Sequence, residues 1–421
     1  MLDLKFIREN PELVKDASNK KGVSVDVDLI IELDEKIRKM TTKTERLRQE
    51  KNQKAKLFAQ ADANERKSLS ENSKQLSRDI SVDEASLRTW GEELKKLLLI
   101  TPMIPSDEAP VGPDESFNEI VKTVGKLPKF DFDPQDHVDI LESNAWVDFK
   151  RAASTSGSRT YALKGDLVLL EMALMRFALD RLIAEGFTPI TVPPYAREEA
   201  FFGTGHFPLH RDEAYKLAND DFYLIGTSEV ILNQLHSNEI LQNSDLPILY
   251  AGYSNCFRRE AGSAGRDVRG LLRVHHFQKV EQFVICGNNA EESRRWHDRL
   301  LGISEMILSE LDLPYQIVAC STGDMGLGKF RMHDIETWVP SLDKYRETHS
   351  CSTLHDWQSR RTNTRYRGDD NKAIEYVHTL NNTAIATPRV FAPLLEIYQR
   401  KDGRMNIPKV LQPYMGDRNV M

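Results

Sequence analysis

The stretch 257–282 reads FRREAGSAGRDVRGLLRVHHFQKVEQ and decides how the fold of the larger part of the chain is interpreted. Its two apolar and aromatic ends predict strands, and the glycine-rich segment between them predicts a connecting loop. Arg258 and Arg273 flank this loop, whereas Phe277 and Glu281 lie on the return strand. Arginine side chains suit phosphate oxygens, and an aromatic ring suits stacking on a base. The stretch therefore predicts a nucleotide-binding hairpin.

Segments of helical and strand character surround this hairpin. Residues 166–185 are apolar and precede a glycine, which predicts a helix, and residues 187–194 predict a strand closed by prolines. Further strands are expected at 222–225, 248–253 and 280–286, and further helices at 290–311 and 393–398. No GxGxxG motif follows a predicted strand and no GxxxxGKS/T motif occurs, which disfavours Rossmann and P-loop nucleotide sites. The mixture predicts the α+β class, with an antiparallel sheet flanked by helices.

The first 100 residues predict a separate helical module. Apolar residues recur at steps of three, four and seven from Leu29 to Phe58 and again from Leu69 to Leu97, and no proline interrupts either run. The polar stretch 61–66 between them predicts a turn. Two such helices pack as an antiparallel hairpin, a coiled-coil arm about 45 Å long.

The first helix of this arm is strongly basic. Nine Lys and Arg residues lie between Lys36 and Lys56, where only Glu45 and Glu50 oppose them. The net charge of −7 does not indicate a nucleic-acid partner for the whole chain, so any such surface must be local. The charge run alone fits two interpretations equally, a solvated coiled-coil face or a surface for backbone phosphates.

A proline-rich connector separates the arm from the rest of the chain. Four prolines lie between Thr101 and Pro113, and this composition ends the second helix and predicts an extended segment. We therefore expect two domains, a helical arm at 1–110 and a catalytic domain at 111–421.

Composition narrows the class of protein further. No apolar run approaches the roughly 18 residues of a membrane span, and the N-terminus lacks the apolar core of a signal peptide. A cytoplasmic protein without membrane contact is expected. The four cysteines are widely spaced without a CxxC pair, which disfavours disulfides. Metal binding by His349, Cys351 and His355 is possible in principle but disfavoured, because no second ligand pair stands at a known spacing.

The tripeptide Thr227-Ser228-Glu229 offers two hydroxyls and a carboxylate. By itself, the tripeptide is more typical of a helix N-terminus, where a capping hydroxyl precedes an early glutamate.

The stretch from Phe257 to Gln282 resembles motif 2 of class II aminoacyl-tRNA synthetases, in the form used by bacterial-type seryl-tRNA synthetases. The resemblance covers nearly all of the chain. The basic hairpin resembles the family's tRNA-binding arm, and Thr227–Glu229 match its TSE loop. The segment ending at Pro193 resembles motif 1, which implies a homodimer, and residues 379–389 resemble motif 3.

The resemblance implies a role for each candidate residue. Contacts to L-serine are implied for Thr227, Ser228, Glu229, Arg258, Glu281 and Thr383. Contacts to ATP are implied for Arg258, Arg259, Glu260, Arg273, Val274, Phe277, Glu347, Thr348, His349, Ser350 and Arg389. The implied catalytic residues are Arg258, Arg273 and Arg389, and the implied tRNA contacts are Lys43, Arg46, Lys51 and Lys54. Glu347 and Ser350 would hold Mg²⁺, because their oxygens suit that hard cation.

The chain departs from the family pattern at a few of these positions. His349 replaces a serine and Thr353 an asparagine, both close to the implied Mg²⁺ ligands. In motif 3, Asn382 and Pro388 replace glycines, and Thr383 replaces a serine but keeps the hydroxyl. These departures are expected to act on local geometry and turnover, not on the fold.

The resemblance implies a serine–tRNA ligase that makes seryl-adenylate from L-serine and ATP and transfers serine to the 3′ end of tRNA(Ser). It leaves open whether tRNA(Sec) is also a substrate. One alternative is a ligase that loads amino acids onto a carrier protein, but such relatives lack the basic arm. Another is a non-catalytic paralogue, which the presence of Arg258, Glu347 and Arg389 disfavours. A duplicated enzyme that resists a serine-mimicking antibiotic is the third.

Overall fold

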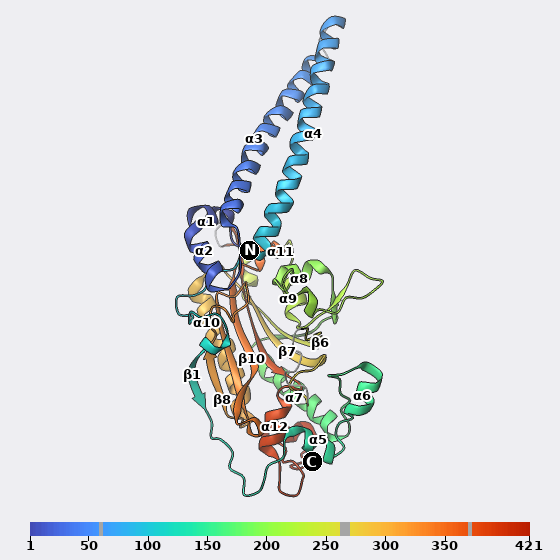
Figure 1. Ribbon diagram of the computed structural model, residues 1–421, viewed down its shortest axis with the longest axis vertical. Helices are drawn as coiled ribbons and strands as arrows, with labels where there is room; N and C mark the ends of the chain where they lie inside the picture. Colours follow the sequence, from blue (N-terminus) through green and yellow to red (C-terminus); the bar gives the residue numbers. More distant parts are fainter. Residues whose placement is uncertain (59–61, 262–269, 369–372) are drawn as a thin grey trace. The chain divides into compact units, whose positions relative to one another are not determined.

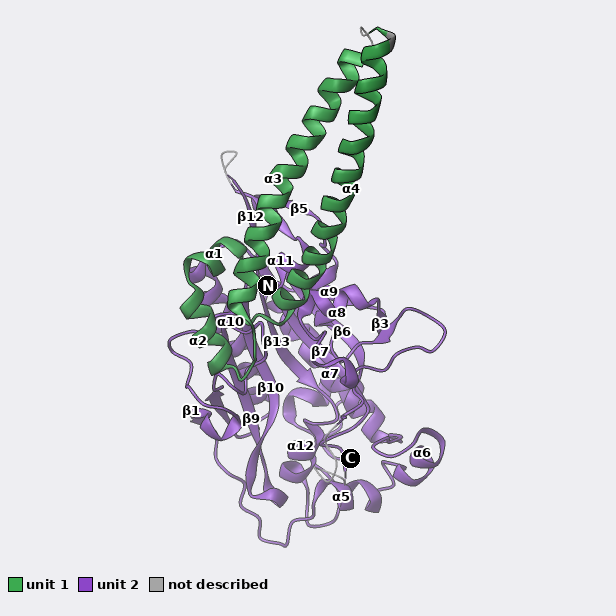
Figure 2. Ribbon diagram, turned by 45° about the horizontal axis from the view of Figure 1, so that its top comes forward, with its two compact units in different colours: residues 1–102 green, residues 103–421 purple. Residues whose placement is uncertain are grey.

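The computed structural model describes residues 1–58, 62–261, 270–368 and 373–421. The chain forms two compact units, residues 1–102 and residues 103–421, which Figure 2 colours separately. The glycine-rich loop predicted between Arg258 and Arg273 falls largely outside the described residues. No helix in the described part of the chain has the length and apolar character that a membrane crossing requires.

Unit 1 is entirely helical (Figure 1). Its helices are α1 (Leu4–Glu9), α2 (Pro11–Lys20), α3 (Val27–Phe58) and α4 (Ala63–Ile100). The long helices α3 and α4 pack side by side along the arm, which confirms the predicted hairpin. The short helices α1 and α2 were not predicted. They pack against α3 and bury Ile7 and Val14 beside its buried Ile30 and Leu33.

The turn predicted at 61–66 is wrong from residue 63 onward, and residue 61 lies outside the described residues. The side chain of Asp62 accepts hydrogen bonds from the backbone N–H groups of Asn64 and Glu65, and the Glu65 side chain accepts one from the Asp62 N–H. This capping box begins α4 at Ala63. The polar residues that suggested a turn are therefore the cap and first turn of a helix.

Unit 2 contains a large, mostly antiparallel sheet, as predicted. Its order is β1-β8-β9-β10-β13-β7-β6-β2, and only β2 runs parallel to its neighbour. These strands are β1 (Glu119–Val124), β2 (Thr188–Thr191), β6 (Ile248–Phe257), β7 (His276–Cys286), β8 (Tyr315–Ala319), β9 (Arg331–Val339), β10 (Lys344–His355) and β13 (His378–Ala386). Two small sheets contain β3 (Tyr195–Ala196) with β4 (Tyr223–Leu224), and β5 (Ile240–Gln242) with β11 (Arg365–Arg367) and β12 (Ile374–Tyr376).

Helices surround this sheet. They are α5 (His137–Ser143), α6 (Phe149–Ser156), α7 (Asp166–Ala184), α8 (Glu198–Thr204), α9 (Glu229–Gln234), α10 (Ala290–Glu310), α11 (Ser359–Thr362) and α12 (Phe391–Tyr398). Both α7 and α10 pack against β7 and β13, and they bury Leu174, Phe177 and Ile307 in the main core. The predicted helices at 166–185 and 290–311 are thereby confirmed within one residue at their ends.

The proline-rich connector is extended, as predicted, and is anchored within unit 2. The Met103 N–H donates to the carbonyl of Leu327 at 2.9 Å, and the Thr322 N–H donates to the carbonyl of Pro110 at 2.8 Å. From Met103 onward the connector therefore contributes backbone hydrogen bonds to the second unit.

Trp357 packs against two glycines beside α8. Its side chain is fully buried, and the Arg361 guanidinium lies 3.6 Å from the centre of its ring. A Cβ atom on Gly205 would lie 2.4 Å from the ring, and one on Gly328 would lie 2.5 Å away. Gly205 also has φ +86°, in the left-handed region that favours glycine.

Replacing Gly205 with alanine should therefore lower the free energy of unfolding through two separate terms. The left-handed φ costs about 1–2 kcal/mol in a residue with a Cβ, and the clash with Trp357 adds about 1–3 kcal/mol. Gly186→Ala is the matched control, because Gly186 has φ +90° but no atom within 4 Å of its Cβ position. Urea unfolding of both variants measures the difference. Equal losses would show that Trp357 does not constrain position 205.

Candidate active site

Strand alternation on β7 and β13 places polar side chains on the face opposite α10. The amides of Gln282 and Asn382 donate to the Ser304 hydroxyl of α10, each at 2.9 Å. Because side chains alternate between the two faces of a strand, Glu281 and Asn381 point away from α10. In the β7–β13 register Glu281 lies opposite Thr383, and Gln282 lies opposite Asn382.

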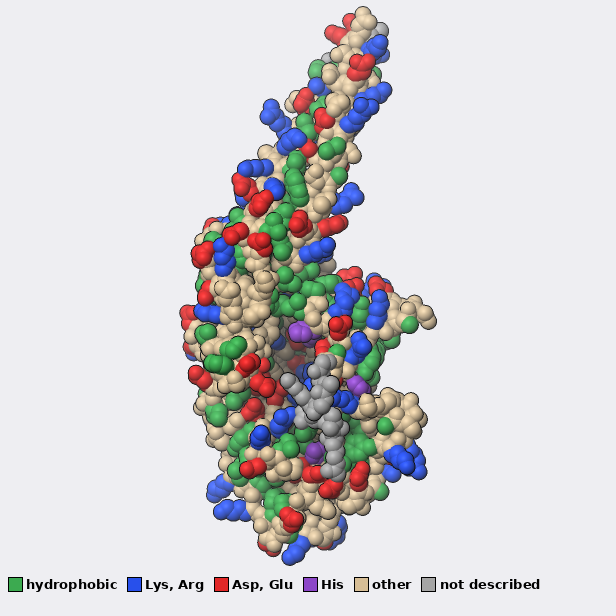
Figure 3. Space-filling view, viewed as in Figure 1, with side chains coloured by type: hydrophobic (Ala, Val, Ile, Leu, Met, Phe, Trp, Pro, Cys, Tyr) green, Lys and Arg blue, Asp and Glu red, His purple; other side chains and the backbone are tan. Residues whose placement is uncertain are grey.

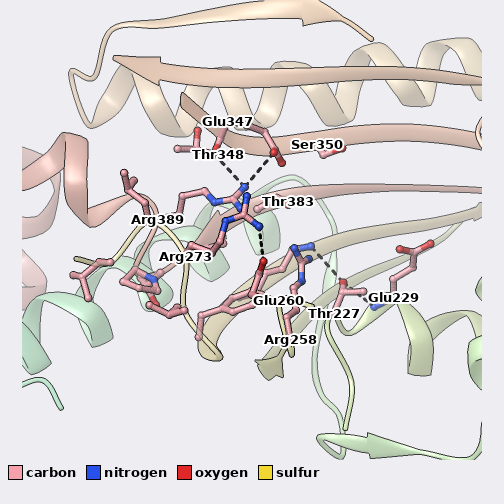
Figure 4. Close-up of a pocket in the computed structure, with 18 of the residues that line it drawn as sticks. Thr227, Glu229, Arg258, Glu260, Arg273, Glu347, Thr348, Ser350, Thr383 and Arg389 are labelled. Carbon is pink, nitrogen blue, oxygen red and sulfur yellow. Dashed lines mark hydrogen bonds and ion pairs between the residues drawn. The ribbon is translucent and has the colours of Figure 1, made fainter. Parts of the chain in front are cut away.

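A cavity opens on this face, and it collects most of the predicted site residues (Figure 4). The predicted residues that line it are Thr227, Glu229, Arg258, Glu260, Arg273, Val274, Phe277, Glu347, Thr348, Ser350, Thr383 and Arg389. They come from strands, helices and loops that lie far apart in the sequence. The structure thus brings together the segments that resemble motif 2, the TSE loop and motif 3.

One end of the cavity is rich in arginine (Figure 4). Arg273 pairs with Glu260 at 2.5 Å. Arg389 pairs with Glu347 at 3.2 Å and also donates to the Glu347 backbone carbonyl at 3.3 Å. Guanidinium groups in this arrangement match the oxygens of a polyphosphate, and their present carboxylate partners hold them in place.

The Arg258 side chain stacks near the ring of Phe277 at this end. Its guanidinium carbon lies 5.2 Å from the ring centre, and its Nε donates to the Gly226 carbonyl at 3.4 Å. The stacked ring and the guanidinium offer a flat surface beside positive charge, which suits a nucleobase and a phosphate.

The opposite end is small and contains buried carboxylates. Glu229 accepts hydrogen bonds from Gln358 at 2.7 Å and from Asn381 at 3.2 Å. Asn381 also donates to Glu281 at 3.1 Å. Lys279 forms an ion pair with Glu281 and donates to the Thr227 hydroxyl at 3.3 Å. Both carboxylates are thus held by partners before a ligand arrives.

The charge state of Glu229 follows from these neighbours. Burial alone would raise the pKa of the Glu229 carboxyl, but Lys329, His206, Gln358 and Lys279 outweigh it and hold that pKa below its usual value. Glu229 is therefore a carboxylate at neutral pH, available to an ammonium group.

Four predicted residues do not line the cavity. Ser228 is buried and its hydroxyl lies 3.4 Å from the Gly252 carbonyl. Arg259 donates to the Asp212 carbonyl at 3.2 Å. Glu281 is fully buried in the layer beneath the cavity. His349, the fourth, lies in the core.

The position of His349 follows from an irregularity in β10. The β9–β10 register shifts between Glu347 and His349, so that Glu347 and Thr348 both reach the cavity. The His349 ring lies 2.8 Å from the Thr348 hydroxyl and 3.1 Å from the Ala384 carbonyl. Burial lowers the pKa of His349 to about 4, so the ring is neutral at pH 7. A neutral ring donates to the carbonyl through Nε2 and accepts from the hydroxyl at Nδ1.

The cavity also contains polar residues that were not assigned a role from the sequence, among them His206, Lys279, Lys329 and Asn381. Lys279 and Asn381 lie inside the motif-like segments, so strand alternation with Glu281 and Thr383 could have identified them. His206 and Lys329 come from loops that carry no recognisable motif, and only the folded chain brings them to the cavity.

The candidate tRNA-binding residues of α3 differ in their surroundings. Lys43 pairs with Asp83 at 3.0 Å, and Lys54 pairs with Glu50 at 2.8 Å. Arg46 and Lys51 form no ion pair with any residue that the structure describes. Basic and acidic side chains alternate along the visible face of the arm (Figure 3). The free positive charge of α3 is therefore smaller than the sequence suggests.

Comparisons with known proteins agree with this arrangement. The family model for the seryl-tRNA synthetase N-terminal domain matches residues 1–105. The model for the tRNA synthetase class II core domain (G, H, P, S and T) matches residues 213–398.

Similar proteins match over their full length. The serine–tRNA ligase of Deinococcus radiodurans is 50% identical, across 100% of this chain and 99% of the relative. A crystal structure of seryl-tRNA synthetase from Pyrococcus horikoshii complexed with ATP superposes with a TM-score of 0.91 at 40% identity, covering 100% of this chain and 99% of that one. Cytoplasmic serine–tRNA ligase from Naegleria fowleri in complex with AMP gives a TM-score of 0.87 at 32% identity, covering 100% and 98%. The chain belongs to the seryl-tRNA synthetase family of class II aminoacyl-tRNA synthetases.

Proposed function

We propose that this chain is a serine–tRNA ligase, which activates L-serine with ATP and transfers it to the 3′ end of tRNA(Ser). One observation carries the proposal: a single cavity joins an arginine-rich end to a small acidic end, as the reaction of a triphosphate with an amino acid requires. Full-length relatives carry the same name, and no comparison supports a carrier-protein ligase or an antibiotic-resistant duplicate.

The arginine-rich end binds ATP. Glu260 and Phe277 contact the adenine, and Arg273 and Arg389 contact the triphosphate. Arg389 pairs with Glu347 before ATP binds. The phosphate oxygens of ATP would replace Glu347 as the partner of Arg389, and this would release the Glu347 carboxylate. The carboxylate of Glu347 and the hydroxyl of Ser350 line the same cavity and are suitable oxygen ligands for Mg²⁺, which neutralises triphosphate charge when bound.

The acidic end binds L-serine. Glu229 takes the ammonium group, and Thr227 and Thr383 surround the hydroxyl. Glu281, buried beneath the cavity, holds Lys279 and Asn381 in position. Arg258 lines the same cavity beside Phe277 and holds the serine carboxylate next to the α-phosphate. The hydrogen-bond network that holds Glu229 and Glu281 orients the substrate without further rearrangement. Positioning of the reactants is therefore the main contribution to the rate acceleration.

The reaction then proceeds in two steps. The serine carboxylate oxygen attacks the α-phosphorus in line, a bond to the bridging oxygen breaks, and pyrophosphate leaves. Arg258, Arg273 and Arg389 stabilise the negative charge that develops on the phosphates. In the second step the 3′-terminal hydroxyl of tRNA attacks the carbonyl carbon of seryl-adenylate and loses its proton to solvent. The bond between that carbon and the phosphate oxygen breaks, and AMP leaves with the electron pair.

The arm, the dimer and the location complete the proposal. Residues 1–110 form the tRNA-binding arm and residues 111–421 the catalytic domain, and tRNA(Sec) is a second substrate where the organism has it.

A homodimer is supported by apolar side chains exposed on α7 at Leu169 and Met172, in the segment that resembles motif 1. A cytoplasmic location follows from the role in protein synthesis.

Arg389→Ala should reduce serine-dependent ATP–pyrophosphate exchange by about 10²–10³-fold, since that is the typical effect of removing one transition-state donor. Arg400→Ala is the matched control, because Arg400 is paired with Asp402 and does not line the cavity. Melting temperatures check that both variants fold. Near-normal exchange in a well-folded Arg389→Ala variant would remove Arg389 from the active site.

Serine should be activated in preference to alanine by roughly 10⁴-fold, because a site built to bind a hydroxyl leaves its polar groups unpaired with the analogue that lacks one. Threonine should be rejected less strongly, by about 1–3 kcal/mol for its extra methyl group. Thr383→Val should reduce the preference for serine over alanine, and Thr383→Ser should retain it. The measurement is pyrophosphate exchange with each amino acid. Equal activation of serine and alanine by the unmodified chain would contradict the assignment.

Replacing Arg46 and Lys51 together with glutamine should weaken tRNA binding more than replacing Lys43 and Lys54, which already have carboxylate partners. Removal of one contact to a phosphate should reduce the slope of log affinity against log salt by about 0.7–0.9. All four changes together should have the largest effect on binding.

Pyrophosphate exchange without tRNA should stay unchanged in these variants, because every residue of the cavity lies in unit 2. Circular dichroism is needed for the Lys43 variant, since it leaves the buried Asp83 unpaired. Unchanged tRNA affinity in all variants would identify the charge run as a solvated helix face.

A further inference from the structure

Arg273, one of the two arginines proposed to contact the triphosphate, lies outside the strands of the sheet. The segment 270–275 follows the glycine-rich loop and ends where β7 begins. After Arg273 the backbone is fixed at His275, whose carbonyl accepts a hydrogen bond from the Arg258 N–H at 3.0 Å. Before Arg273, the position of the chain depends on what holds residues 270–271.

The ring of His137 contacts this part of the backbone. Its Nε2 lies 3.4 Å from the backbone nitrogen of Leu271. That distance is long for a hydrogen bond, but a second observation places the ring against the same segment, because a Cβ atom on Gly270 would collide with Nε2. Leu271 is fully buried, so its N–H group needs an acceptor from the protein. The His137 ring lies where that acceptor is needed.

The other nitrogen of the ring is held by Glu396 of α12. Nδ1 of His137 lies 2.8 Å from Oε1 of the fully buried Glu396, and the His137 backbone N–H donates to the same oxygen at 3.0 Å. Glu396 also accepts from the N–H and the hydroxyl of Ser341, each at 2.8 Å. Because a carboxylate only accepts, Nδ1 of the neutral ring carries the hydrogen, and Nε2 is left as the acceptor for the Leu271 N–H.

The ring therefore joins the two segments that carry the triphosphate arginines. α5 begins at His137 and packs against α12, which begins two residues after Arg389. Leu271 lines the active-site cavity and lies two residues before Arg273. We infer that His137 is a positioning residue, whose ring sets the backbone at Leu271 against α12 and thereby holds Arg273 where the triphosphate binds. The inference rests on the proposed function, because it takes the arginine-rich end as the triphosphate site.

Two substitutions separate the contributions of the two ring nitrogens. The amide of asparagine ends as many bonds from the backbone as Nδ1, so His137→Asn can still donate to Glu396 but no longer reaches Leu271. The amide of glutamine ends one bond further out, near the position of Nε2, so His137→Gln can still accept from Leu271 but loses the bond to Glu396. His137→Asn should therefore impair ATP binding, whereas His137→Gln should mainly lower the melting temperature.

Calorimetric titration of the full chain with ATP and Mg²⁺, without serine or tRNA, measures the effect on binding. His137→Asn should weaken ATP binding by roughly 3–10-fold, the consequence of one lost hydrogen bond, and His137→Gln should stay within about twofold of the unmodified chain. In pyrophosphate exchange, His137→Asn should raise the KM for ATP and leave the KM for serine unchanged. In the Arg273→Ala background it should weaken ATP binding by less than about twofold, because its effect acts through Arg273.

His378→Asn is the matched control. His378 is also buried, its Nδ1 lies 2.7 Å from the Ser293 hydroxyl, and it does not line the cavity. The melting temperature of this variant shows how much stability is lost with a buried imidazole, and its affinity for ATP should be unchanged.

The inference is overturned if well-folded His137→Asn binds ATP as tightly as the unmodified chain, or if its effect persists undiminished in the Arg273→Ala background. It is also overturned if the loss of ATP affinity follows the loss of stability across the three histidine variants, since a purely structural role predicts that order. If His137→Asn does not fold, retained ATP affinity in folded His137→Gln supports the inference and a loss overturns it. Serine-dependent pyrophosphate exchange by the unmodified chain tests the proposed function separately.

Discussion

The pairing of β7 with β13 is the constraint on which the active site depends. It sets Glu281 opposite Thr383 on the cavity side, and Gln282 opposite Asn382 on the side of α10. A shift of one residue would exchange these two faces and place amides where the carboxylate and hydroxyl now lie. The hydrogen bonds of Gln282 and Asn382 to Ser304 oppose such a shift, because they would be lost with it. The buried hydrogen bonds on the α10 face of the sheet thus determine which side chains lie on the cavity face.

The same sheet allows several charges to be buried together. Unpaired, each would cost several kcal/mol, but Asn381 bridges Glu229 and Glu281, and Lys279 pairs with Glu281. The amino-acid end is therefore rigid and charged before the substrate binds. The arginine-rich end differs, because phosphate oxygens can replace Glu260 and Glu347 as the partners of its arginines.

The sequence predicted the features that rest on long repeated patterns or on contiguous motifs. The long helices α3, α4, α7 and α10 and the strands β6 and β7 lie where apolar periodicity placed them. The short helices α1 and α2 carry too few residues for a clear period. The start of α4 was misjudged because polar residues are typical both of turns and of the cap that Asp62 provides.

For the site, a motif identifies residues but not the direction of their side chains. Alternation along β10 would put His349 and Glu347 on one face, yet the register shift after Glu347 separates them and sends His349 into the core. Lys329 and His206 reach the cavity from distant loops, so no local pattern could have indicated them.

Glu347 connects the active-site cavity to a neighbouring hollow that Asp334 also lines. It lines both of them, pairs with Arg389 and is a charged neighbour of Asp334. Burial and the nearby Glu347 carboxylate raise the pKa of Asp334 well above its usual value. When a triphosphate takes over Arg389, Glu347 loses its cation, and its negative charge raises the pKa of Asp334 further. The protonation of Asp334 is therefore coupled to nucleotide binding through one side chain.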